Sequence, residues 1–147
     1  MSFVASVSTD TGWLLGEHVL FGQPTVPGSA YLEYARAAFE LASGSVGCEM
    51  RDLFVLTPLA VPAGTTKEMR VVFTPAAHGF QFVIESGAGA AREEHVRGAI
   101  TAIAPGEVRH DIAALRAQCT EQTIDEAVLV RYRAAKEGGY LALGPRW

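Results

Sequence analysis

The stretch that decides the fold is SAYLEYARAAFELA, residues 29–42. Its strongly polar side chains, Glu33, Arg36 and Glu40, are three and four positions apart, so on a helix they share one narrow stripe. Ser29 is a candidate N-cap for that helix. All the other positions hold Ala, Tyr or an aliphatic or aromatic residue. A helix that is apolar over most of its circumference is buried on most sides, so a sheet must wrap around it.

The segments on either side of this helix supply the strands of that sheet. Residues 3–8 alternate apolar and small polar side chains, which predicts a short edge strand. Strand runs separated by short turns imply an antiparallel meander, so the predicted class is α+β, an antiparallel sheet around a long central helix. The downstream strands are predicted at residues 53–61 (kinked at Pro58), 69–74, 80–85 and 95–103.

The chain changes character after residue 105. Residues 111–118 are predicted to form a short helix. A capping-box pattern at residues 123–126 opens another helix, which we expect to end at the Gly138-Gly139 pair. Residues 140–147 then form a short apolar segment with nothing downstream to pair with.

Composition excludes several classes of protein. The 147 residues are 49% hydrophobic, which is enough to build a core and excludes disorder. A formal charge of −4 without a basic stripe argues against nucleic-acid binding. No apolar run is long enough to span a membrane, and we see no signal-peptide pattern. The two cysteines, Cys48 and Cys119, lack CxxC spacing, so we expect reduced thiols and a cytoplasmic protein.

One histidine combines several features of a catalytic site. His18 begins the pattern His18-x-x-x-Gly22-x-x-x-x-Pro27, in a predicted irregular loop over residues 16–28. Apolar neighbours favour the neutral imidazole that a general base requires. Gly22 allows backbone to approach a ligand closely, so that its N–H can donate to a carbonyl oxygen. Pro27 stiffens the loop, and Gly28 precedes a helix whose N-terminus offers spare N–H groups.

The segments LGEHVLFG (residues 15–22) and VPGSAYLE (residues 26–33) resemble the N-terminal hotdog of polyketide synthase dehydratase domains, whose HxxxGxxxxP signature is complete here. Residues 53–59 resemble the strand that follows the family's central helix, and residues 95–98 its HxxG strand. Tyr132, Gly139-Tyr140 and Gly144-Pro145 resemble the GYxYGPxF segment that opens its second hotdog. Leu143 and Trp147 stand where that motif has Tyr and Phe.

This resemblance implies half of a double hotdog, with an N-terminal hotdog at residues 1–104, a linker with short helices at 105–139, and the start of a truncated second hotdog at 140–147. It also implies a lyase that removes water from a β-hydroxyacyl thioester on an acyl carrier protein. His18 would abstract the α-proton, and the Gly22 N–H would polarise the thioester carbonyl. No cofactor is implied beyond the carrier's phosphopantetheine arm, which belongs to the substrate.

The same resemblance assigns the catalytic acid to an Asp of the second hotdog, some tens of residues past Trp147. We therefore expect an incomplete enzyme that pairs with a second hotdog half or with its own copy. Two other functions stay open: a pyran-forming cyclase or double-bond isomerase that uses the same His18, and a non-catalytic scaffold that only dimerises its synthase. The sequence does not specify the acyl chain length, the hydroxyl stereochemistry or the pathway product.

The remaining chemistry-bearing residues have simpler interpretations. His95 is expected to be structural, whereas His78 and His110 are expected to be solvated. No histidines or acids have metal-ligand spacing on one element, so we predict no metal site.

Overall fold

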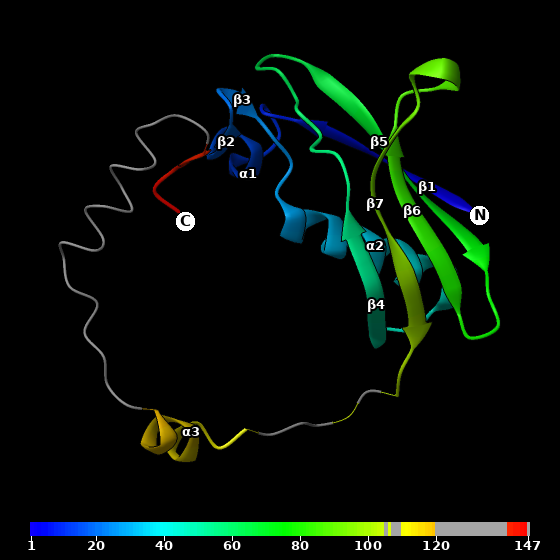
Figure 1. Ribbon diagram of the computed structural model, residues 1–147, viewed down its shortest axis with the longest axis vertical. Coiled ribbons are helices and arrows are strands. Elements are labelled where there is room, and N and C mark those ends of the chain that lie inside the picture. Colours follow the sequence, from blue (N-terminus) through cyan, green and yellow to red (C-terminus); the bar gives the residue numbers. More distant parts are fainter. Residues whose placement is uncertain (105, 107–109, 120–140, 147) are drawn as a thin grey trace.

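The computed structural model describes residues 1–104, 106, 110–119 and 141–146. Its largest unit is a five-stranded antiparallel sheet in the order β1-β5-β6-β7-β4, with helix α2 against one face (Figure 1). The strands are β1 (Ser2–Ser8), β4 (Cys48–Val55), β5 (Thr66–Pro75), β6 (Phe80–Ser86) and β7 (Glu93–Ala102). The predicted α+β class, a sheet around a central helix, is therefore confirmed.

Helix α2 (Gly28–Ser43) is the central helix that the apolar stretch predicts. It packs against β4, β5, β6 and β7. Its single polar stripe faces water, where Arg36 forms ion pairs with Glu33 at 2.8 Å and with Glu40 at 2.7 Å. Gly44 ends the helix in the left-handed conformation, with φ of +70°, and donates its N–H to the Glu40 carbonyl.

The core lies between α2 and the sheet. Tyr31 and Phe39 of the helix are 1% and 2% exposed, and they meet a layer of large side chains from the strands. Phe73 is central to this layer, with ring centroids 5.7–6.5 Å from four other phenylalanines. The sheet contributes Met69, Val71, Phe73, Phe82, Ile84, Val96 and Ile100.

A second, three-stranded sheet carries the candidate site. It has the order β3-β2-β8 and consists of β2 (His18–Leu20), β3 (Gln23–Pro24) and β8 (Leu141–Leu143). The short helix α1 (Trp13–Gly16) leads into β2. In Figure 1 this small sheet lies near the end of α2 at which that helix begins. The end of the described chain therefore returns to the segment that contains His18.

Several local predictions are confirmed. Strand β1 is an edge strand, and helix α3 (Ile112–Gln118) starts at its predicted position, where the Asp111 carboxylate accepts a hydrogen bond from the Ala114 N–H. The 3₁₀ turn η1 (Gly89–Ala91) lies between β6 and β7, in the interval left between the strands predicted at residues 80–85 and 95–103. The helix predicted over residues 123–139 lies outside the described residues.

The predicted meander holds only for β5, β6 and β7. Strand β4 pairs with β7 at the far side of the sheet from β5, so the chain crosses over between β4 and β5. The predicted kinked strand over residues 53–61 is also wrong in its bounds, because β4 begins at Cys48 and ends at Val55. Its irregularity is a register shift between Arg51 and Phe54, at Asp52 with φ of +52°, rather than at Pro58.

Candidate functional site

His18 is held by a pair of hydrogen bonds to one residue. Its Nδ1 atom lies 2.8 Å from the Thr25 carbonyl oxygen, and the Thr25 N–H donates to the His18 carbonyl at 2.9 Å. A carbonyl oxygen can only accept, so Nδ1 carries the proton and Nε2 is the basic nitrogen of the neutral ring. The side chain is half-buried. This is the tautomer and the degree of exposure that a general base on a substrate needs.

Gly22 forms the tip of a tight hairpin between β2 and β3. Leu20 pairs with Gln23, which leaves Phe21 and Gly22 as a two-residue loop with φ of +49° and +74°. Positive φ at both central positions is typical of the type I′ turn, whose twist suits a hairpin. The predicted irregular loop over residues 16–28 is therefore wrong, because the chain there forms α1 and this hairpin. Phe21 carries the conformational cost of the turn and is 73% exposed.

Pro27 and Gly28 lie where the hairpin runs into helix α2. Pro27 is the N-cap, with φ of −64°, and its carbonyl accepts the Ala30 N–H at 3.0 Å. The prediction of Ser29 as N-cap is wrong, since Ser29 lies inside the helix, which has no side-chain cap. The pre-set φ of proline makes it a suitable start for the helix without such a cap.

A third segment, residues 59–61, hydrogen-bonds to the residues at the end of the hairpin. The Val26 N–H donates to the Leu59 carbonyl at 2.9 Å, and the Val61 N–H donates to the Pro24 carbonyl at 2.7 Å. Thr25 forms an isolated bridge with Ala60. Thr25, whose carbonyl orients His18, is itself 3% exposed and fixed from both sides. No sequence signal marks its role, because the contact to His18 uses its backbone.

The last described segment lies on the other edge of β2. His18 pairs with Leu143, Val19 with Ala142 and Leu20 with Leu141. The structure thus brings His18 next to the strand that leads into the Gly144-Pro145 pair, a pairing that the sequence motifs did not predict. It also shows that residues 141–143 have a partner upstream in the chain.

Comparisons with known proteins show the family to which the chain belongs. Residues 1–87 match a family described as polyketide synthase dehydratase domain. The chain belongs to this dehydratase family. Its fold matches a dehydratase domain of a trans-AT polyketide synthase from Brevibacillus brevis, with a TM-score of 0.80 and 25% identity over 99% of this chain and 55% of that one. The dehydratase from the CurF module of curacin synthase gives 0.77 and 22%, over 97% of this chain and 52% of that chain.

Two curated relatives are whole synthases. Polyketide synthase ThaG of Burkholderia thailandensis is 31% identical over 139 residues, and PksM of Bacillus subtilis is 32% identical over 133 residues. The chain covers 2% and 3% of these proteins and about half of the solved dehydratases. It therefore corresponds to the N-terminal part of a polyketide synthase dehydratase, one half of a double hotdog, and the predicted recognition and fold are confirmed.

The chain has a second histidine with a different environment. His95 is fully buried, with Nδ1 2.9 Å from the Thr57 carbonyl and Nε2 2.8 Å from the Ser86 hydroxyl. Its ring stacks on Tyr31, with centroids 6.2 Å apart. Both ring nitrogens of His95 are engaged and the side chain does not reach solvent, which agrees with the structural role predicted for it.

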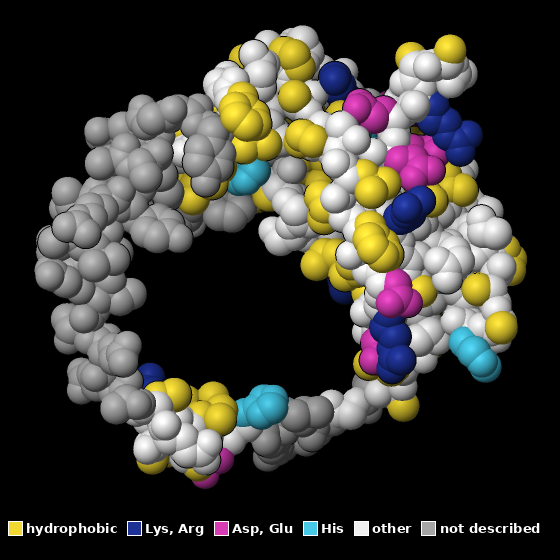
Figure 2. Space-filling view, in the orientation of Figure 1, with side chains coloured by type: hydrophobic (Ala, Val, Ile, Leu, Met, Phe, Trp, Pro, Cys, Tyr) yellow, Lys and Arg dark blue, Asp and Glu magenta, His cyan; other side chains and the backbone are white. Residues whose placement is uncertain are grey.

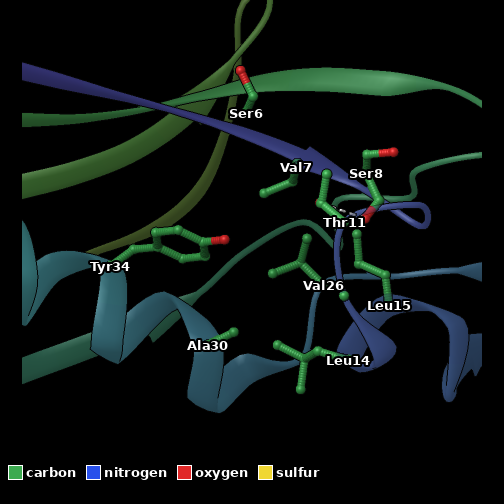
Figure 3. A pocket seen from close by; sticks show the side chains of 10 residues that line it. Ser6, Val7, Ser8, Thr11, Leu14, Leu15, Val26, Ala30 and Tyr34 are labelled. Carbon is green, nitrogen blue, oxygen red and sulfur yellow. Dashed lines mark hydrogen bonds between the residues drawn. The ribbon is translucent and has the colours of Figure 1, made fainter.

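A small cavity lies between β1, α1 and the first turns of α2 (Figure 3). Its volume is about 140 Å³, below the roughly 300–1,000 Å³ of ordinary ligand sites. Val26 and Ala30 point into it from the segment that follows the hairpin, while Ser8 and Thr11 add hydroxyl groups on the β1 side. His18 is not among the residues that line this cavity.

The part of the chain that the structure describes offers neither a metal site nor a membrane-spanning helix. Among these residues, no group of three or more His, Cys, Asp or Glu side chains is arranged to hold a metal ion. Within the same residues, no helix has the length and hydropathy needed to cross a membrane.

Proposed function

We propose that this chain supplies the histidine half of a β-hydroxyacyl-carrier-protein dehydratase. The observation that carries the proposal is the 2.8 Å contact between His18 Nδ1 and the Thr25 carbonyl. This contact makes Nε2 the basic nitrogen, and the surrounding pattern with Gly22 and Pro27 resembles the signature of the dehydratase family. The substrate is a β-hydroxyacyl thioester carried on the phosphopantetheine arm of an acyl carrier protein.

The reaction divides between His18 and an acid. His18 Nε2 takes the proton from the α-carbon, and the electrons of that C–H bond form the new double bond. The C–O bond at the β-carbon breaks, and the leaving hydroxyl takes a proton from an acid and departs as water. The products are an α,β-enoyl thioester and water, with no cofactor consumed.

Gly22, Pro27 and Gly28 are proposed to bind the thioester. In the left-handed conformation at the hairpin tip, the Gly22 backbone is open on its side-chain face, since no atom lies within 4 Å of the place that a Cβ would occupy. Its N–H would donate to the thioester carbonyl and stabilise the enolate-like charge. Pro27 and Gly28 begin α2 just after β3, and the helix dipole at that N-terminus favours negative charge.

The acid is proposed to come from a second hotdog half. Support comes from β4, an edge strand whose apolar side chains, with the residue that follows it, are exposed: Phe54 by 55%, Val55 by 64% and Leu56 by 44%. Figure 2 shows hydrophobic side chains at the surface on this side of the sheet. An exposed apolar edge strand is a surface that proteins normally cover. The partner is a second hotdog half or another copy of this chain.

The proposed division of the chain keeps the bounds expected from the sequence: an N-terminal hotdog at residues 1–104, a linker at 105–139 and the beginning of a second hotdog at 140–147. We place the reaction in the cytoplasm, in keeping with the free thiols of Cys48 and Cys119.

In some related dehydratases, the loss of a histidine or of an aspartate accompanies the loss of activity. A histidine-to-phenylalanine variant is described as inactive for the dehydratases of the curacin modules CurJ and CurK, and so is an aspartate-to-asparagine variant for CurK. For this chain, the role of His18 rests on its own geometry and on the experiment that follows.

The test uses the complete dehydratase domain that contains this chain and a carrier-bound β-hydroxyacyl substrate. Mass spectrometry follows the loss of water from the acyl group. His18→Ala should lower the rate by about 10²–10⁴-fold, the usual contribution of a general base. The matched control is His78→Ala, which removes an exposed histidine from a turn and should leave the rate unchanged.

Two results would contradict the proposal. Substantial enoyl formation by a folded His18→Ala variant would remove His18 from the mechanism. If the unaltered domain leaves the β-hydroxyacyl group intact but converts a carrier-bound, hydroxyl-bearing enoyl thioester to a product of the same mass, with a ring or a shifted double bond, the same histidine would be assigned to cyclisation or isomerisation instead.

A further inference from the structure

Glu17 connects two segments that lie far apart in the sequence. It is the C-cap residue of α1, directly before His18, and its N–H donates to the Trp13 carbonyl at 2.9 Å. Its own carbonyl accepts the Gly144 N–H at 2.8 Å. Its carboxylate accepts the Arg146 N–H at 2.9 Å and the Arg146 Nη1 at 2.5 Å. Glu17 therefore binds the turn after β8 through three separate hydrogen bonds.

The surroundings of Glu17 strengthen this contact. Its side chain is only 14% exposed, whereas that of Arg146 is 58% exposed. The Arg146 guanidinium lies over the Trp13 ring, 5.5 Å from the centroid. A partly desolvated carboxylate that accepts both a backbone N–H and a guanidinium forms charge-assisted hydrogen bonds, which are stronger than neutral ones. This contact should therefore stabilise the structure more than an ordinary surface ion pair, which contributes little to stability.

Gly144 shows how closely the two segments approach. A Cβ atom on Gly144 would collide with the Cβ and Cγ atoms of Glu17. The position of the turn is thus set by contact with the Glu17 side chain as well as by hydrogen bonds. Directly before this turn, Leu143 pairs with His18.

We infer that Glu17 is a positioning residue, which fixes the His18 backbone by latching the Gly144–Arg146 turn and holding β8 against β2. Strand β2 has three residues, so it depends on its two neighbours for its place. Thr25 fixes the imidazole from the β3 side, and Glu17 secures the strand from the β8 side. This inference rests on the proposed function of His18 and extends it to a residue that does not touch substrate.

The test compares Glu17→Gln with Glu33→Gln in the complete dehydratase domain. The glutamine side chain has the same shape as glutamate, but its amide offers one oxygen where Arg146 presents two N–H donors. Glu33→Gln is the matched control, because it removes one carboxylate from an exposed arginine pair on α2. Two quantities are measured: the kcat and KM for dehydration, and backbone hydrogen exchange in β2, β8 and β6.

For Glu17→Gln we expect kcat to fall about 10- to 100-fold with KM changed less than about threefold, since small misplacements of catalytic groups have effects of this size. Exchange should accelerate in His18–Leu20 and Leu141–Leu143 but not in Phe80–Ser86. Arg146→Ala should act in the same direction, and the double variant should be no worse than Glu17→Gln alone because both break one latch. Glu33→Gln should change neither quantity.

Three results would overturn the inference: a kcat for Glu17→Gln within about twofold of the unaltered domain, unchanged exchange in β8, or equal acceleration in β6, which would mean general destabilisation. A different result would contradict the proposed function. If the unaltered domain does not dehydrate the substrate, the proposed function is wrong, and the exchange measurement still decides whether Glu17 latches β8 to β2.

Discussion

Tyr31 and His95 stack with their ring planes 9° apart and their centroids 6.2 Å apart, between the central helix and the sheet. The Tyr31 hydroxyl accepts the Leu59 N–H at 3.1 Å, and His95 Nδ1 lies 2.9 Å from the Thr57 carbonyl. These two side chains satisfy backbone groups on either side of Pro58, in the segment that leaves β4. The same segment hydrogen-bonds to Val26 and forms a β-bridge with Thr25. The stacked pair therefore stabilises the segment that holds Thr25, the residue that orients His18.

Tyr31→Phe should lower the free energy of unfolding by about 1–3 kcal/mol, since it leaves the buried Leu59 N–H without its acceptor. Chemical denaturation of the variant and of the unaltered protein measures this difference. The matched control is Tyr34→Phe, whose hydroxyl has no hydrogen bond among residues that the structure describes. An equal loss in both variants would show that ring packing, rather than the Leu59 contact, is responsible.

Stability should also fall at high pH because of Tyr31. Burial raises the pKa of Tyr31 to about 12 from an ordinary value of 10.0, partly offset by the hydrogen bond from Leu59. Below pH 10 the phenol is protonated in both states, and it contributes no pH dependence. Between pH 10 and about 12 the unfolded chain loses the proton first, so the free energy of unfolding decreases as pH rises.

Denaturation curves recorded from about pH 9 to pH 12 test this dependence. Tyr31→Phe should show a smaller decrease over the range than the unaltered protein, while Tyr34→Phe should follow the unaltered protein. A decrease that is identical in all three would assign the alkaline loss to other groups.

Gly22→Ala should destabilise the protein by about 1–2 kcal/mol, because an L-residue at φ of +74° is strained even where its side chain has space. The control is Gly16→Ala at the end of α1, where φ is not positive and a Cβ also meets nothing within 4 Å. That change should be neutral or slightly stabilising. Thermal unfolding of both variants makes the comparison, and equal stability of the two would contradict the role of the left-handed turn.

The central helix and most strands could be predicted because their signals are local. The polar stripe at Glu33, Arg36 and Glu40 marks the exposed side of α2, and alternation marks β6 around Phe82. The order of the strands could not be predicted in the same way. Strand β4 precedes β5 in the chain but pairs with β7, and nothing in the local pattern of either strand specifies that crossover.

The candidate site was predictable in part for the same reason. His18, Gly22 and Pro27 form a compact motif, so their proximity follows from the sequence. The link between Glu17 and Arg146 could not be predicted, because an ion pair between residues 129 positions apart leaves no periodic signal. The two-residue turn at Phe21 was equally hidden, because aromatic residues rarely adopt positive φ and the sequence there shows no Asn-Gly or Asp-Gly pair.

The pairing of β2 with β8 has a consequence for the order in which the molecule assembles during synthesis. All five strands of the large sheet and α2 have been made by the time Ala102 leaves the ribosome, so the core can form around Tyr31 and Phe73. Strand β2, which begins with His18, can pair with β3 at once, but it gains its second neighbour only when Leu141–Leu143 have been made. The histidine proposed as the base therefore belongs to the part of the hotdog that is finished last.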